Sequence, residues 1–143
     1  MDVSVLRQQI LRALDEARKH AASKREAADH AREAYETFLR DVAAPVFLQA
    51  ANVLRALRQE FVVHTPAGSV RLEGPNAQEF IELELDAGGA GPQVMGRTGL
   101  MRHKGGPLVE ERPVAPGKSI EAVTEDDVAT FLTTEIPRLV MRA

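Results

Sequence analysis

The chain contains neither Gly nor Pro between Asp2 and Ala44, and Ala, Leu, Arg, Glu and Lys dominate this stretch. These residue types have high helix propensity, and the two residues that most readily interrupt a helix are missing. The stretch is therefore predicted to form one uninterrupted helix. At 1.5 Å per residue such a helix is on the order of 60 Å long, which exceeds the diameter of the small domain that follows it.

Apolar side chains recur along this helix at alternating spacings of three and four residues, which is the repeat of a coiled coil. The ends of this seam carry large side chains, whereas its middle is almost all alanine and is interrupted by Lys24. Because the following domain is too small to cover the whole seam, residues 1–44 are predicted to form an oligomerisation arm. The residues predicted for this contact are Leu6, Ile10, Leu14, Ala21, Ala28, Tyr35, Phe38 and Val42.

The simplest partner for this seam is a second copy of the chain, so we predict a homodimer. In an antiparallel, two-fold symmetric pairing, the large residues at one end of one helix would cover those at the other end of its partner. The alanines would then lie where the two helices cross.

Residues 45–143 are predicted to form a globular α+β domain. Pro45 should kink or break the long helix, and a second helix with a broad apolar stripe should continue to about Gln59. The pattern then changes to period two, which predicts an antiparallel β-meander of about four to five strands. The expected strands are Phe61–His64, Ser69–Glu73, Phe80–Asp86, Gln93–Met101 and about Leu108–Val114.

A C-terminal helix packed on the sheet completes the expected fold. Thr124 can cap its first turn, and Asp127 stands three residues later, as in a capping box. Pro137 is expected to kink the last turn. The predicted buried stripe comprises Val128, Phe131, Leu132, Ile136, Leu139 and Val140.

One strand carries a row of carboxylates that could form a functional site. Glu82, Glu84 and Asp86 alternate with apolar residues, so the three acids share one face of the strand. Three such acids could coordinate a hard cation or share a proton, which makes a metal-dependent enzyme one hypothesis. The alternative is a solvated face, and hairpin pairing across the Gly88–Gly91 turn should place Glu82 opposite Arg97.

A small basic cluster suggests a different chemistry. Arg97, Arg102, His103 and Lys104 lie near a glycine-rich turn and could contact nucleic acid or another anionic partner. No aromatic residues accompany them, and the net charge of −3 gives no overall attraction to phosphate. Their alternative role is to balance the charge of the neighbouring acidic strand.

Other catalytic signals are missing from the sequence. The chain has no cysteine, its four histidines lie far apart, and its glycine-rich segments lack the spacing of phosphate loops. We therefore predict no catalytic residue, no cofactor and no metal. The sequence shows neither a signal peptide nor an apolar run long enough for a bilayer, so we expect a cytoplasmic protein that does not enter membranes.

These features favour a non-enzymatic interaction protein, such as an adaptor, a chaperone-like protein or a scaffold, that acts as a homo-oligomer. Its unidentified protein partner would bind the sheet. The alternatives are a nucleic-acid-associated regulator that uses the basic cluster and, third, a metal-dependent enzyme that uses the carboxylate row. The residues predicted for interaction are Glu82, Glu84, Asp86, Arg97, Arg102 and Lys104.

Overall fold

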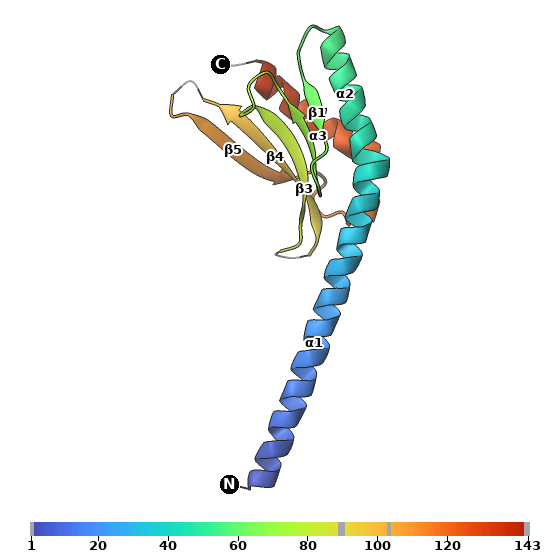
Figure 1. The fold of residues 1–143 in the computed structure, drawn as a ribbon, viewed down its shortest axis with the longest axis vertical. Helices are drawn as coiled ribbons and strands as arrows, with labels where there is room; N and C mark the ends of the chain where they lie inside the picture. The colour runs from blue at the N-terminus through green and yellow to red at the C-terminus, as the bar shows by residue number, and fades with distance from the viewer. Residues whose placement is uncertain (1, 89–90, 103, 142–143) are drawn as a thin grey trace.

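The computed structural model describes residues 2–88, 91–102 and 104–141 and confirms the predicted α+β fold (Figure 1). A long helical rod leads into a five-stranded sheet, and a C-terminal helix follows it. The helical elements are α1 (Val3–Phe38), the π-helical η1 (Leu39–Ala43), α2 (Ala44–Ala56), the 3₁₀-helical η2 (Ile120–Ala122) and α3 (Glu125–Val140). The strands are β1 (Val62–His64), β2 (Val70–Glu73), β3 (Phe80–Asp86), β4 (Gln93–Met101) and β5 (Pro107–Pro113).

The helical path from α1 through η1 to α2 continues past Pro45 without a break. The turn just before it is π-helical, and the N–H of Ala44 donates to the carbonyl of Leu39, five residues earlier. A proline inside an α-helix lacks an N–H and crowds the preceding turn, and a wider turn relieves this conflict. The predicted kink therefore takes the form of a π-helical segment, and the helical axis changes direction there (Figure 1).

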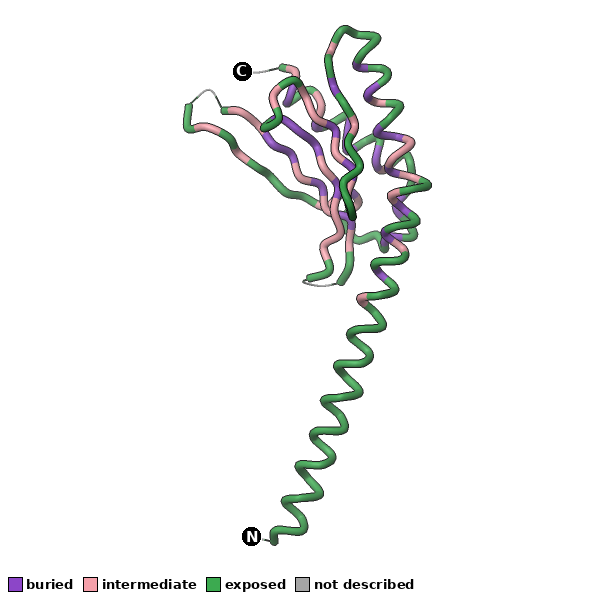
Figure 2. The backbone as a smooth tube through the Cα atoms, in the orientation of Figure 1, coloured by how far each residue is buried: buried purple, intermediate pink, exposed green. Residues whose placement is uncertain are grey.

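The sheet is an antiparallel meander in the order β1-β2-β3-β4-β5. Its inner face packs against α2 and α3, and the buried residues of this face include Val70, Leu72, Ile81, Leu83 and Val94. The other face, which we call the outer face, carries the alternate residues. Figure 2 shows that the buried segments concentrate in the central strands, whereas β5 is mostly exposed.

The C-terminal part of α1 belongs to the same core. Ala31, Tyr35 and Phe38 are at most 4% exposed, and the rings of Tyr35 and Phe38 stack with 6.0 Å between centroids. Every residue from 2 to 27 is exposed, and this part of the helix projects beyond the sheet (Figure 2). We call residues 2–27 the exposed rod and the remainder of the described chain the head.

The N-terminus of α3 has the predicted capping box. The hydroxyl of Thr124 accepts from the N–H of Asp127, and the Asp127 carboxylate accepts from the N–H of Thr124 at 2.9 Å. Lys118 donates to the same carboxylate at 2.7 Å, and its hydrogen bond, with those from Thr124, lowers the pKa of Asp127. The predicted stripe packs on the sheet, but it also includes the buried Glu135, which the apolar pattern missed.

Candidate interaction surfaces

The exposed rod carries large apolar side chains that the head does not cover. Ile10 is 51% exposed and Leu14 is 47% exposed. An i,i+4 ion pair between Asp15 and Lys19, at 3.2 Å, lies among the rod's charged residues. The large apolar side chains exposed on the rod are Val3, Val5, Leu6, Ile10, Leu11 and Leu14.

The predicted oligomerisation residues divide into two groups. Leu6, Ile10, Leu14 and Ala21 are exposed on the rod, and Ala28 is half-buried where the rod meets the head. In contrast, Tyr35 and Phe38 lie in the chain's own core, and Val42 packs partly against it. These two aromatic rings are therefore not free to cover the N-terminal leucines of a second copy, as the full-length antiparallel pairing requires.

A row of alternating charge crosses the outer face of the sheet. The strand register aligns one residue from each strand, and Glu82 lies opposite Arg97 as predicted. The guanidinium of Arg71 lies 3.1 Å from Glu82, and that of Arg97 lies 3.2 Å from Glu111. From β2 to β5 the row consists of Arg71, Glu82, Arg97 and Glu111, and His64 of β1 lies opposite Arg71 at its end.

The three predicted acids have partners within the chain. Besides the contact between Glu82 and Arg71, Glu84 lies 3.7 Å from Arg97, and Asp86 accepts from the N–H of Gly88 at 3.1 Å. Within the described ranges, no three His, Cys, Asp or Glu side chains are grouped closely enough to hold a metal ion. These contacts are those of an ion-paired sheet face.

The predicted basic residues do not form one patch. Arg97 lies in the middle of the outer face between Glu84 and Glu111. Arg102 stands beyond the end of β4, where its guanidinium donates to the carbonyl of Gly105 at 2.9 Å, and the exposed Lys104 follows in the same turn. His103 lies outside the described residues.

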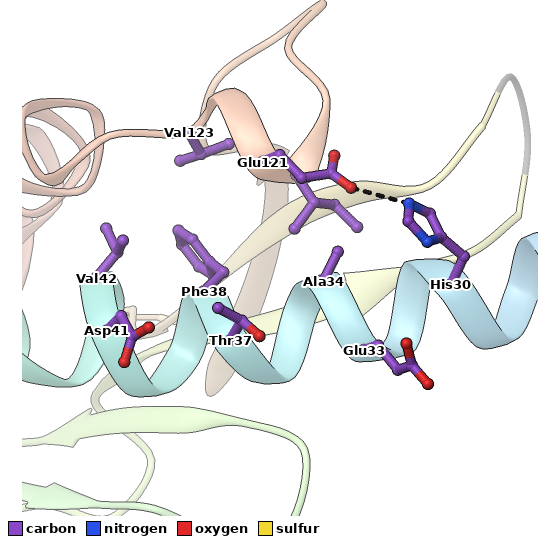
Figure 3. Close-up of a pocket in the computed structure, with 10 residues that line it drawn as sticks. His30, Glu33, Ala34, Thr37, Phe38, Asp41, Val42, Glu121 and Val123 are labelled. Carbon is purple, nitrogen blue, oxygen red and sulfur yellow. Dashed lines mark ion pairs between the residues drawn. The ribbon is translucent and has the colours of Figure 1, made fainter.

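A pocket of about 490 Å³ opens between α1 and η2 (Figure 3). In this view Phe38 of α1 and Val42 of η1 point toward Val123, and His30 lies 3.2 Å from Glu121 across the gap. The sequence carries no signal for this pocket, because its two sides are distant in the chain. Its lining residues are His30, Glu33, Ala34, Thr37, Phe38, Asp41, Val42, Ile120, Glu121 and Val123.

A second hollow, of about 380 Å³, runs between α2 and α3. The described residues that line it carry no charge, and Val53 on its α2 side is 58% exposed. This apolar groove follows from the broad stripe of α2, which is wider than the contact with the sheet and α3 requires. Its lining residues are Val46, Gln49, Ala50, Val53, Leu54, Ala129, Leu132, Thr133, Ile136 and Pro137.

Comparison with protein-family models, with curated proteins and with solved structures found no significant match to this chain. In the described part of the chain, every helix is too short or too polar to cross a bilayer.

Proposed function

We propose that this chain is a non-enzymatic interaction protein, an adaptor or scaffold, that acts as a homodimer assembled through its exposed rod. The proposal rests on one observation: large apolar side chains are exposed to solvent on the part of α1 that projects beyond the head. An isolated helix is only marginally stable in water, and most helices in proteins are stabilised by packing of an apolar face. A second copy would supply that packing.

The energetics support a contact of moderate strength. Fully burying one Leu, Ile or Val side chain contributes about 1.5–3 kcal/mol. The side chains on the rod are about half exposed in one copy, and two copies would bury both sets. Set against the low end of the association cost, about 4 kcal/mol, their sum leaves roughly the 8 kcal/mol that a micromolar dimer needs and less than the roughly 12 kcal/mol of a nanomolar one. We therefore expect a dimer that dissociates at micromolar rather than nanomolar concentrations.

The outer face of the sheet is the surface that we propose for the protein partner. It presents five carboxylates and only two guanidiniums, so it carries net negative charge. This charge favours a partner with basic side chains over nucleic acid. The carboxylates are Glu73, Glu82, Glu84, Asp86 and Glu111, and the guanidiniums are Arg71 and Arg97.

The oligomeric state tests this proposal directly. Light scattering from about 1 to 100 µM should show the mean mass of the wild type rise with concentration to that of a dimer. Replacing Leu6, Ile10 and Leu14 together with Gln should give a monomer, because the apolar contact is lost while the head is untouched.

The matched control is Val5→Gln. Val5 is 48% exposed, like the three other residues, but it lies on the opposite side of the helix from their stripe. This variant should remain a dimer. A wild type that stays monomeric throughout the concentration range removes the basis of the proposal.

A further inference from the structure

We propose that two copies pair through their exposed rods in antiparallel orientation, with Ile10 of each copy opposite Leu14 of the other. The two-fold axis then passes level with Arg12. This inference rests on the proposed self-association and specifies its geometry. We derive this geometry from two observations: which apolar residues of the rod are exposed, and at which positions charged residues interrupt the apolar stripe.

The register brings almost every large apolar side chain of the rod into the contact. Along the seam, Val3 faces Ala21 of the second copy, and Arg7 faces Ala17, whose small side chain lets the guanidinium reach water. Beside the axis, Leu11 of one copy meets Leu11 of the other. Leu6 flanks the same seam, and among the large apolar residues exposed on residues 2–27 only Val5 points away from it.

Other arrangements place like charges in the seam. In a parallel pairing each seam residue faces its own equivalent, so Arg7 would face Arg7 and Lys24 would face Lys24. An antiparallel pairing shifted by one heptad, with Leu14 opposite Ala17, would oppose Arg7 and Lys24 twice. Like charges held at such short distance oppose association. The antiparallel orientation also sets the two helix dipoles favourably.

The overlap ends before it reaches the head. The N-terminus of each rod lies near residues 22–23 of the other, short of Ala28, where burial begins. Lys24 therefore stands just outside the overlap, which explains how a charged residue can occupy the apolar stripe. The part of the stripe from Ala31 onward packs into the chain's own head.

This geometry holds two heads at opposite ends of a two-helix rod. From Arg12 to Ala28, where the head begins, the helix rises roughly 24 Å, so the heads begin on the order of 48 Å apart. A partner with two binding sites at that spacing would engage both outer faces at once and gain affinity by multivalency. The proposed scaffold is therefore bivalent.

Disulfide trapping tests the register, because the chain has no cysteine of its own. Ile10→Cys and Leu14→Cys are prepared separately, one of them with an added mass tag, then mixed and oxidised slowly. We expect the mixed disulfide between positions 10 and 14 at least tenfold in excess over either homodisulfide. The matched control mixes Ile10→Cys with Ala21→Cys, which should not cross-link.

The outcomes separate the register from self-association. A Leu14→Cys homodisulfide as the main product indicates parallel pairing, and efficient linkage of Ile10→Cys to Ala21→Cys indicates the shifted register. Either result overturns this inference and leaves the proposed dimer intact if light scattering of the reduced proteins still gives a dimer. A monomer by light scattering overturns both proposals. Circular dichroism of each variant verifies that the head is folded.

Discussion

The Nε atom of Arg112 in β5 lies 2.7 Å from a carboxylate oxygen of Glu135 in α3, which ties the edge of the sheet to the C-terminal helix. Glu135 is 2% exposed, and its second oxygen accepts from Arg138 at 2.9 Å. The guanidinium of Arg112 also lies 4.4 Å from the ring centre of Phe131. Burial disfavours the charged form of the Glu135 carboxylate, and the ion pairs with Arg112 and Arg138 offset this desolvation cost.

Glu135→Gln should destabilise the protein in a pH-dependent manner. Burial is the largest influence and raises the pKa of Glu135, but the hydrogen bonds and charges of Arg112 and Arg138 outweigh it and leave the pKa lowered. A lowered pKa stabilises the fold above the unfolded value of about 4.3, and this contribution is lost as the pH falls through the folded pKa. We expect a cost of about 1–3 kcal/mol at pH 7 that shrinks below about pH 4.

Urea unfolding of the wild type and Glu135→Gln at pH 7 and below about pH 4 measures the change in the free energy of unfolding at each pH. The control is Glu36→Gln, an exposed carboxylate on α1, which should change the free energy of unfolding by less than about 0.5 kcal/mol at either pH. An equal cost for Glu135→Gln at neutral and acidic pH would show that the charge plays no part.

Gly96→Ala should destabilise the head by overpacking. Gly96 lies on the inner face of β4, and a methyl group there would overlap the ring of Phe131 from α3. Adding a methyl to a well-packed core costs about 1–3 kcal/mol. The control is Gly88→Ala, where the nearest atom would lie at 3.5 Å. Denaturant unfolding should give a much smaller change for the control, and equal changes would mean that α3 moves freely away from the sheet.

Arg71→Lys should weaken the outer face although it preserves charge. The Arg71 guanidinium donates to Glu73, Glu82 and the carbonyl of Ala77, and it lies 3.7 Å from the ring centre of Phe80. A lysine cannot make this planar set of contacts. We expect a loss of about 1–3 kcal/mol.

Thermal unfolding of Arg71→Lys beside Arg102→Lys measures the effect. The guanidinium of Arg102 bonds within its own exposed turn, so its replacement should shift the midpoint by a much smaller amount. Equal shifts would argue that the contacts of Arg71 are not formed in solution.

Tyr35→Phe should keep or increase stability. The Tyr35 hydroxyl is buried and has no hydrogen-bond partner among the described residues. Burial, reinforced by the charges of Glu84 and Glu82, raises the pKa of Tyr35 well above its usual value, so the group stays neutral. Removing an unsatisfied hydroxyl should gain up to about 1 kcal/mol.

Chemical denaturation measures the effect of Tyr35→Phe. Tyr35→Leu is the comparison, because it removes the ring and should cost stability. A loss of stability in Tyr35→Phe would imply that the hydroxyl is hydrogen-bonded.

Much of the fold could be predicted because local chemistry and tertiary packing agree. The alternation of acids with Ile81, Leu83 and Leu85, between turn residues, gave the bounds of β3 that the structure has. The second helix ends at Ala56, earlier than the predicted Gln59. Arg58 there adopts a positive φ of 62°, and a non-glycine residue gives no sequence signal for such an ending.

The candidate surfaces were less predictable. The register of Glu82 and Arg97 followed from the hairpin, but Glu82 pairs with Arg71, which lies directly opposite it on the other neighbouring strand. Arg97 reaches Glu84, a diagonal neighbour on β3. Along α1, Tyr35 and Phe38 continue the helical face of the rod. Periodicity defines a face, and only the folded head shows which part of that face is already covered.

Lys24→Glu distinguishes the proposed antiparallel register from the shifted one. With Ile10 opposite Leu14, Lys24 lies past the N-terminus of the second copy, so reversing its charge should leave the dissociation constant unchanged within about twofold. In the shifted register Lys24 faces Arg7, and the new attraction should tighten the dimer several-fold. Arg7→Leu is the companion variant: it places an apolar residue opposite Ala17 and should tighten the proposed dimer by roughly tenfold, about 1.4 kcal/mol. Sedimentation equilibrium measures the dissociation constants of the wild type and of the two variants, and a several-fold tightening of the dimer by Lys24→Glu would exclude the register proposed for the rod.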